Sequence, residues 1–411
     1  MIPNNHKRTN VVVIGGGIFG CAISYYYSKN NPGKKIIVLE RNEVCSAATS
    51  RAAALMTIIR NKRSYIPLSL ETYRAVADME KQLGESLGMK MAGMMHVAAS
   101  EKSVRDLDDI MAIAEEYEQT ARYISNDEAH KKSPWLNTEE AIKIGFIPNE
   151  AYCDPYLLGT FFMRCAKMQG AKILPGVEVT GLIKEEDVII GVETSSGRIY
   201  ADTVIDAAGA WAPIWAMEAG AGLPMSPVRS QYWITEKSSI FSANSPMVLL
   251  PDAQAYARPE GGALLFGIRE KNSMSVSPKD IPADITDFIF SNDNGMNDLQ
   301  EVSDKLARFF PSLYDIGIKN YIAGFSGYTP DTQLVLGEMR DTKGFLVAAG
   351  CCGAGIALSG GIGLSIAEMA AGRRGPFDVS SFRINRYNDV DPFSREWLDK
   401  CAKARSEKVS G

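Results

Sequence analysis

Three glycines near the start of the chain have the spacing of a phosphate-binding turn. The stretch from Val11 to Ile23 reads VVVIGGGIFGCAI, in which Gly15, Gly17 and Gly20 match the pattern GxGxxG. The first glycine of this pattern permits a tight turn, the second lets the backbone approach a pyrophosphate, and the third lets a helix pack against a strand. The turn predicts a pyrophosphate at a helix N-terminus, although glycine-rich turns also arise for structural reasons alone.

An acidic residue stands at the distance from this turn at which a carboxylate binds ribose. Lys35 to Leu39 (KIIVL) is typical of a buried strand, and Glu40 follows it, about twenty residues beyond Gly20. A carboxylate there accepts hydrogen bonds from ribose hydroxyls and repels a 2′-phosphate, which disfavours NADP. The two signals together predict a cofactor with an ADP half, and their spacing does not separate NAD from FAD.

The elements that must position these residues are parallel strands followed by helices. Val11 to Ile14 is apolar and mostly β-branched, as a central strand buried on both faces is, and a helix is expected after it. Phe345 to Ala349 is a later apolar strand pattern, and glycines follow it. Those glycines permit backbone N–H groups to approach a ring that carries negative charge when reduced. A tight strand-to-helix turn is the alternative interpretation.

Several motifs along the chain occur together in one enzyme family. Besides the glycine turn, they are CSAATSRAAALMTIIRNK, VIDAAGAWA, AGFSGYTPDTQLVLGE and GFLVAAGCCGAGIALSGGIG. In content and order they resemble the FAD-dependent amine and amino-acid oxidoreductases related to D-amino acid oxidase, such as glycine oxidase, sarcosine oxidase and the flavin subunits of proline and sarcosine dehydrogenases. The resemblance extends from about residue 10 to residue 382. It implies an α/β fold, in which a Rossmann-like FAD-binding domain carries an inserted α+β substrate domain built on an antiparallel sheet.

The resemblance also implies which residues contact FAD. They are Gly15, Gly17, Ile18, Phe19 and Gly20 around the pyrophosphate, Glu40 on the ribose, Arg41 and Val179 by the adenine, Thr49 and Ser50 near the phosphates, Ala208, Gly209 and Trp211 in a returning loop, and Gly350, Gly353, Ala354, Gly355 and Ile356 at the pyrimidine edge of the flavin. Residues 49–56 contain no histidine and residues 324–337 no cysteine, where some relatives attach flavin covalently. Noncovalent FAD is therefore expected.

The predicted FAD-binding domain is discontinuous. It comprises residues 1–90, 146–225 and 323–382, while residues 91–145 and 226–322 form the substrate domain and residues 383–411 a C-terminal extension with a surface helix. The strand patterns QYWITE and GALLFGI predict a sheet that covers the flavin. Residues 281–311 are predicted to form helices on both sides of the polar loop SNDNG.

Two positively charged substrate anchors of the family are absent. Ser326 stands at the position of an arginine that binds the substrate carboxylate in glycine-oxidase-like relatives, and Ala357 at that of a sarcosine-oxidase lysine. Ala354 also replaces a familiar histidine. A missing anchor must be replaced if the substrate carries a carboxylate, because an unpaired buried carboxylate is very costly.

Arg60 is the leading candidate for that replacement. It lies in MTIIRNKRSYIPLSLETY, a segment similar to the one in which sarcosine oxidase places an arginine near the substrate. Arg258, beside Tyr256 in YARPEGG, is a second candidate, and Tyr256 and Tyr328 are expected to close the pocket. The alternative for each of these side chains is an ordinary structural role.

Composition and charge argue against several other functions. The formal net charge of −5 disfavours an obligatory nucleic-acid or anionic-membrane partner, since both usually require a basic face. Seven scattered cysteines and three histidines (His6, His96 and His130), all expected to be structural, leave little material for a metal site. The start MIPNNHKRTN lacks the apolar segment of a signal peptide, and no membrane span is indicated. We expect a cytoplasmic enzyme without a metal.

The resemblance implies oxidation of the C–N bond of a small amine or amino acid to an imine, by hydride transfer to flavin N5. Two alternatives stay open. One is an FAD-dependent 2-hydroxy-acid or polyol dehydrogenase, which needs a base for the hydroxyl proton, and the other is a non-catalytic flavoprotein subunit, which fits the missing anchors. The electron acceptor is oxygen, a quinone or a partner subunit.

Overall fold

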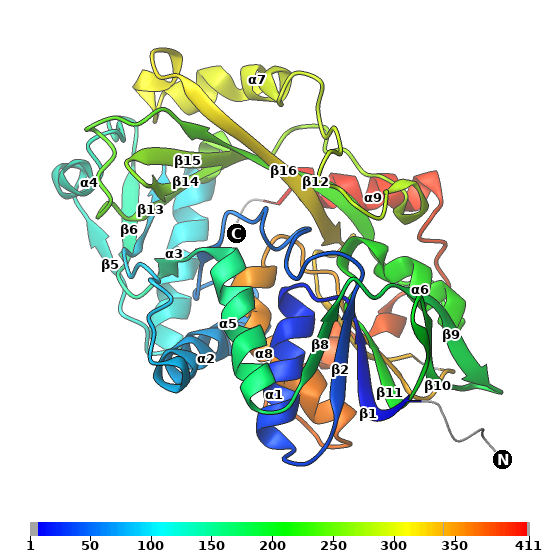
Figure 1. Ribbon diagram of the computed structural model, residues 1–411. Coiled ribbons are helices and arrows are strands. Elements are labelled where there is room, and N and C mark those ends of the chain that lie inside the picture. The colour runs from blue at the N-terminus through cyan, green and yellow to red at the C-terminus, as the bar shows by residue number, and fades with distance from the viewer. Residues whose placement is uncertain (1–6, 340, 409–411) are drawn as a thin grey trace.

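A computed structural model describes residues 7–339 and 341–408 of the chain. His6 lies outside these residues. Two large sheets dominate the structure, and Figure 1 shows one at the lower right and the other across the top and left of the molecule. Among the described helices, none combines the length and the apolar character that crossing a bilayer requires.

The first sheet has a parallel centre with antiparallel strands added to it. In spatial order its main path is β17 (Val335–Glu338), β18 (Phe345–Ala349), β11 (Gly197–Asp206), β1 (Lys7–Ile14), β2 (Ile36–Glu40) and β8 (Lys172–Pro175), with β10 (Val188–Thr194) and β9 (Val179–Glu185) extending from β11. The pairs from β18 to β8 are parallel, and β17 is antiparallel to β18. This is the Rossmann-like sheet expected from the sequence.

The predicted strands of this sheet are confirmed. Val11, Val12 and Val13 of β1 are fully buried, as a central strand covered on both faces requires. Strand β2 lies one residue later than the KIIVL pattern, and β18 has the expected bounds. These strands therefore end at Glu40 and Ala349, which brings the residues after them to one edge of the sheet.

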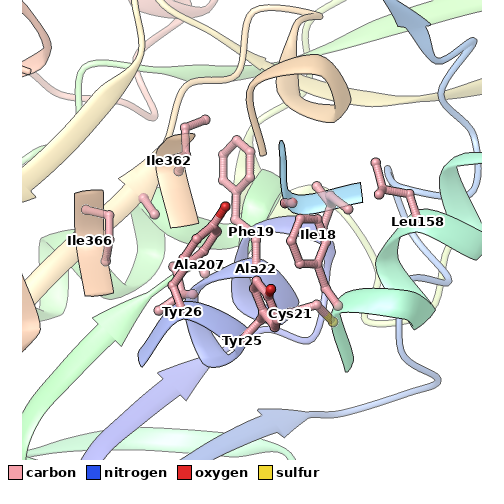
Figure 2. Close-up of a cluster of buried hydrophobic side chains, with 14 of the residues drawn as sticks. Ile18, Phe19, Cys21, Ala22, Tyr25, Tyr26, Leu158, Ala207, Ile362 and Ile366 are labelled. Carbon is pink, nitrogen blue, oxygen red and sulfur yellow. The ribbon is translucent and has the colours of Figure 1, made fainter. Parts of the chain in front are cut away.

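Helices cover one face of this sheet in close packing. They are α1 (Ile18–Asn30), α2 (Ile66–Leu83), α5 (Pro155–Met168) and α8 (Gly355–Ala370). Figure 2 shows part of their core, in which Phe19 of α1 lies near Ile362 of α8. A Cβ at Gly363 would lie 2.7 Å from the Cβ of Ala22, so glycine is required where α8 crosses α1. On the other face, α6 (Ala212–Ala219) packs with the β9–β10 hairpin.

The second sheet also has eight strands. Its spatial order is β16 (Ile318–Tyr328), β12 (Ser226–Thr235), β15 (Ala263–Ile268), β14 (Ala255–Glu260), β13 (Met247–Leu250), β4 (Met94–Ala98), β6 (Lys143–Ile147) and β5 (Arg122–Ile124). Every neighbouring pair is antiparallel except β13 with β4. A separate short pair joins β3 (Leu55–Met56) to β7 (Ala151–Tyr152).

Four further helices accompany this part of the chain. They are α3 (Glu101–Glu116), α4 (Asn126–Lys132), α7 (Met296–Ala307) and α9 (Arg395–Ser406). Ser100 fixes the start of α3 through a capping box, because its hydroxyl accepts from the Ser103 N–H (3.2 Å). Helix α9 is the expected C-terminal helix, and its inner face is buried, including Arg405 at 1% exposure.

Two of the predicted boundaries between the domains fall inside strands of the second sheet. Strand β6 spans the expected boundary at residue 145, and β16 spans the one at residue 322. The division into an FAD-binding and a substrate domain stays a prediction.

One expected helix is absent from residues 281–311. Helix α7 follows the SNDNG loop, but residues 281–290 form turns instead. The Asp284 carboxylate accepts hydrogen bonds from the N–H (2.8 Å) and hydroxyl (2.7 Å) of Thr286, and such local bonds compete with helix formation. Ile285 and Phe290 pack against Phe325 of β16, so the segment is held by its apolar contacts.

Candidate functional site

A large cavity lies between the carboxyl edge of the first sheet and the inner face of the second. Most of the predicted site residues line it: Gly15, Gly17, Ile18, Phe19, Glu40, Arg41, Thr49, Arg60, Val179, Ala208, Gly209, Trp211, Tyr256, Tyr328, Gly353, Ala354, Gly355 and Ile356. Four predicted residues do not line it, namely Gly20, Ser50, Gly350 and Arg258. Elements distant in sequence thus bring one set of glycines and cations to the same space.

The glycine turn has the close contacts expected of a phosphate-binding loop. A Cβ at Gly15 would lie 2.6 Å from the Ala207 carbonyl oxygen, and one at Gly20 would lie 2.0 Å from the Gly15 carbonyl oxygen. Gly20 therefore serves the packing of the turn on α1, without facing the cavity. A Cβ at Gly17 would meet nothing nearer than the Thr49 hydroxyl, at 3.5 Å, so its space opens toward the cavity.

Helix α1 begins at this turn and directs its N-terminus at the cavity. The Ile18 N–H donates to the Thr49 hydroxyl (3.0 Å), and Thr49 is buried. Ser50 differs from its neighbour, since it is exposed and its hydroxyl donates to the carbonyls of Ser46 (3.0 Å) and Ala47 (3.2 Å). Ser50 borders a separate surface hollow.

The Glu40 carboxylate lies at the rim of the turn. It accepts hydrogen bonds from the N–H groups of Gly16 (2.8 Å) and Asn42 (2.9 Å). Each carboxylate oxygen has two acceptor positions, so both retain capacity for a ribose hydroxyl.

Arg41 and Trp211 form a stacked pair beside Glu40. The guanidinium carbon lies 4.0 Å from the centroid of the Trp211 ring, and the buried Nη2 of Arg41 has no hydrogen-bond partner among the described residues. Burial lowers the pKa of this guanidinium. A Cβ at Gly209 would meet no atom within 4 Å, so the loop leaves open space here. A flat polar ring would fit against this pair.

The late glycine loop joins β18 to helix α8. The helix begins at Gly355, and the Ile356 and Ala357 residues of its first turn line the cavity. Gly350 faces away, because a Cβ there would lie 2.9 Å from a methyl carbon of Val335. A second helix N-terminus is thus directed at the cavity, where its N–H groups suit an electron-rich ring.

Arg60 is buried in the cavity wall, with 4% of its surface exposed. Its Nε donates to the Thr57 carbonyl (3.2 Å), while the buried Nη1 has no partner among the described residues. Burial lowers the pKa of Arg60, and the charge of Glu150 opposes this effect. An unpartnered guanidinium nitrogen inside a cavity is a binding position for an anion.

Arg258 is engaged elsewhere. Its Nε donates to the Ala53 carbonyl (2.7 Å), and its Nη1 donates to the Pro259 carbonyl (2.9 Å) and pairs with Glu260. The side chain therefore ties β14 to residue 53, and the structure places no part of it on the cavity.

Tyr256 of β14 and Tyr328 of β16 both line the cavity, and strands β15 and β12 lie between them in the second sheet. Burial raises the pKa of both phenols, so both are neutral hydrogen-bond donors at physiological pH. The Tyr328 hydroxyl lies against Gly353, where a Cβ would approach it to 2.8 Å. The pair thus spans from the second sheet to the late glycine loop.

His96 and Arg269 are among the cavity residues that sequence reasoning missed. His96 lies on β4, is 7% exposed and has a buried Nε2 without a partner among the described residues. Burial lowers the pKa of His96 to about 4, so its ring is neutral at pH 7. Arg269 directly follows the GALLFGI strand. A polar residue at the end of an apolar strand was the available signal for Arg269, while His96 was hidden within the apolar pattern MMHVA.

The residues present fit FAD. The open space at Gly17 and the N-terminus of α1 would suit the pyrophosphate. The unpartnered Nη2 of Arg41 would suit the adenine, and the N-terminus of α8 would suit the flavin. Within the described ranges, no cluster of three or more histidine, cysteine, aspartate or glutamate residues is placed to hold a metal ion.

Comparisons with known proteins agree with this reading of the fold and cofactor. Mouse mitochondrial sarcosine dehydrogenase is 29% identical over 407 residues, which cover 95% of this chain and 43% of that protein. Glycine oxidase of Bacillus subtilis (strain 168) is 24% identical over 93% of this chain and 99% of its own. The crystal structure of L-proline dehydrogenase from P. horikoshii superposes with a TM-score of 0.80 and 25% identity, covering 93% of this chain and 98% of that one.

The chain spans less than half the length of the mitochondrial sarcosine and dimethylglycine dehydrogenases it matches. The family of FAD dependent oxidoreductases related to D-amino acid oxidase matches residues 10–369, most of the chain. This range contains the glycine turn, the late glycine loop and nearly all of both sheets. Helix α9 and the first residues of β1 lie outside it. The chain therefore belongs to this family of FAD dependent oxidoreductases.

Proposed function

We propose that the protein oxidises the C–N bond of a small amine or amino acid that carries a carboxylate. The observation that carries the proposal is the buried, unpartnered Nη1 of Arg60 in the same cavity as the FAD-binding loops. Relatives named for sarcosine and glycine support the substrate class, since both compounds join an amine to a carboxylate by one carbon.

Some of the cavity side chains would bind the substrate, and others would exclude water from it. Arg60 would hold the substrate carboxylate through its Nη atoms, because Nε is already bonded to Thr57. Tyr256 and Tyr328 would close the cavity over the substrate and donate hydrogen bonds to it. When bound, FAD supplies an acceptor for the two electrons and the hydrogen of the C–H bond. Loss of the N–H proton leaves an imine, which water converts to a carbonyl compound and an amine or ammonia.

The proposed cofactor contacts are those of the cavity-lining residues described above, with FAD held noncovalently. The four predicted residues outside the cavity have other tasks: Gly20 and Gly350 serve packing, Ser50 caps its own turn and Arg258 ties two segments together. Oxygen, a quinone or a partner subunit would receive the electrons. The seven cysteines, all unpaired, favour a reducing, cytoplasmic setting.

His96 favours one other reaction on the same scaffold. A 2-hydroxy-acid dehydrogenase needs a base for the hydroxyl proton, and the neutral His96 ring lies in the cavity with an unpartnered Nε2. A pKa of about 4 makes His96 a weak base, which is why amine oxidation is the first proposal.

Turnover of a substrate panel tests the proposal. The purified holoprotein would be given N-methyl amino acids, primary amino acids, amines without a carboxylate and 2-hydroxy acids, with an artificial dye and with oxygen as acceptors. Reduction of the dye by carboxylated amines alone is the expected result. Turnover of hydroxy acids alone would establish the second reaction, and a flavoprotein that reduces neither acceptor with any compound would be a non-catalytic subunit.

A further inference from the structure

Arg269 presents a positive charge to the cavity without a carboxylate to balance it. Its backbone N–H donates to the Gln254 carbonyl (2.8 Å), and its guanidinium carbon lies 5.5 Å from the centroid of the Tyr256 ring. Within residues 7–339 and 341–408, its guanidinium takes part in no hydrogen bond or ion pair. A guanidinium held against an aromatic face keeps its N–H donors for another group.

The acidic neighbour of Arg269 is committed to other partners. Glu270 is 1% exposed, and its carboxylate pairs with Arg405 of helix α9 and with Arg229 of β12 (3.4 Å). Successive residues of an extended segment point to opposite sides. Glu270 therefore faces the helix, while Arg269 faces the cavity.

Lys408 lies within electrostatic reach of both Arg269 and Arg60. The Lys408 ammonium donates to the Cys352 carbonyl in the late glycine loop (2.8 Å), and burial, together with the charges of Arg269 and Arg60, holds its pKa well below the usual range. Arg60 brings its own unpartnered Nη1. Three basic side chains thus gather around the end of the cavity at the late glycine loop, where the charges of Arg60 and Arg269 disfavour the protonated form of Lys408.

Four carboxylate side chains of the described residues line the cavity. Glu40, Glu178 and Asp284 act on Arg41, at the turn expected to hold the ADP half of the cofactor. Asp106 lines the cavity from helix α3. None of them forms an ion pair with Arg60, Arg269 or Lys408 in the part of the chain that the structure describes.

We propose that Arg269 recognises a second anionic group of the substrate, so that the preferred substrate is an amine or amino acid with two carboxylates. One carboxylate would pair with Arg60 and the other with Arg269, near Lys408. This inference rests on the proposed function for the reacting amine, but its binding chemistry is separate from the oxidation. Two anions would offset the charge that the cavity concentrates, which a single carboxylate does only in part.

Binding of substrate-like thioethers tests the proposal without turnover. Thiodiacetate carries two carboxylates and methylthioacetate carries one, and neither contains an amine. Each would be titrated into the holoprotein, with binding read from the change in flavin absorbance. We expect thiodiacetate to bind at least about tenfold more tightly, the gain from one further charge-assisted pair.

Variants identify the residue responsible. Arg269→Met should weaken the binding of thiodiacetate and leave the binding of methylthioacetate unchanged. The ratio of the two affinities should then be within about threefold of one. Arg60→Met should weaken both ligands, and Arg308→Met, which removes an exposed arginine paired with Glu140, should change neither. A wild-type preference near one, an equal loss of both ligands in Arg269→Met, or loss of FAD from that variant would overturn the proposal.

Turnover separates this inference from the proposed function. If the thioether preference holds and depends on Arg269 but no amine is oxidised, the proposed reaction is wrong and the dianion site stands. If sarcosine is oxidised and the preference is absent, the reaction stands and the dianion site is wrong. When both hold, iminodiacetate should be oxidised with a lower KM than sarcosine, and the difference should disappear in Arg269→Met.

Discussion

The buried carboxylate of Glu150 fixes the backbone that presents Arg60. One of its oxygens accepts hydrogen bonds from the N–H groups of Ile58 (2.7 Å) and Ile59 (2.9 Å), and no ion pair joins Glu150 to Arg60 among the described residues. Burial raises the pKa of Glu150 to about 7. The carboxyl group therefore positions the arginine without neutralising it fully, which leaves the guanidinium for a substrate.

The raised pKa of Glu150 makes stability depend on pH. Between the usual value of 4.5 and about 7 the folded state binds more protons than the unfolded state, so the free energy of unfolding falls as pH rises across this window. The full effect is about 3 kcal/mol. Glu150→Gln should flatten the slope, measured by urea unfolding from pH 4.5 to 8. Glu115→Gln, on the exposed face of α3, is the control, and an unchanged slope in Glu150→Gln would assign the pH dependence to another group.

Arg60→Met should weaken substrate binding and spare the cofactor. The variant keeps much of the aliphatic bulk but removes the donors, so the apparent affinity for a carboxylated substrate should fall by about 2 to 5 kcal/mol. An amine without a carboxylate should be affected little. Steady-state KM values and flavin content of the purified variant check this. Loss of flavin would instead give Arg60 a role in holding the cofactor, and wild-type kinetics would exclude it as the anchor.

Two glycines of the turn should respond differently to alanine. Gly17→Ala places a methyl group in open space at the cavity, so the apo-protein should keep its stability while FAD affinity falls tenfold or more, about 1.4 kcal/mol. Gly20→Ala brings a Cβ to 2.0 Å from the Gly15 carbonyl oxygen, and should destabilise the apo-protein itself. Thermal unfolding of the apo-proteins and FAD titration separate the two. If Gly17→Ala binds FAD as tightly as the wild-type protein does, the pyrophosphate binds elsewhere.

The purified protein should be yellow, and acid precipitation should release all of its colour as FAD. Residues 49–56 carry no histidine, and Cys351 and Cys352 are engaged locally, through Ser326 (3.1 Å) and Thr329 (3.5 Å) respectively. The released flavin would be identified by chromatography. Colour that stays with the precipitate would show a covalent bond, and mass spectrometry of flavin-bearing peptides would locate it.

The strands that could be predicted from the sequence are those whose burial is visible in their own residues. The last four residues of β1, Val11 to Ile14, and all of β18 are apolar, and a buried parallel strand has that pattern whatever surrounds it. The residues after such strands were then placed by geometry, since the ends of parallel strands meet at one edge. Family resemblance added the cofactor, which spacing alone left open.

What the sequence did not determine depends on contacts between distant segments. Arg258 and Arg269 both stand on or beside strands of the second sheet, and only the packing shows that Arg258 bonds residue 53 while Arg269 faces the cavity. The segment 281–290 was predicted to be helical because a sequence pattern does not show the hydrogen bonds that the Asp284 side chain accepts. Ser50 follows Thr49 directly, yet a turn directs the two hydroxyls to different partners.

The anchoring of helix α9 has a practical consequence for expression and screening. Arg405 is buried against Glu270, and Lys408 reaches the loop before α8. A purification tag inserted directly after Lys408 would therefore begin close to the cavity and would add charge or bulk there. Strand β1 carries the other end of the chain away from the pocket over eight residues, roughly 26 Å. Tags and immobilisation linkers therefore belong at the N-terminus, where assays of substrate preference would be free of their influence.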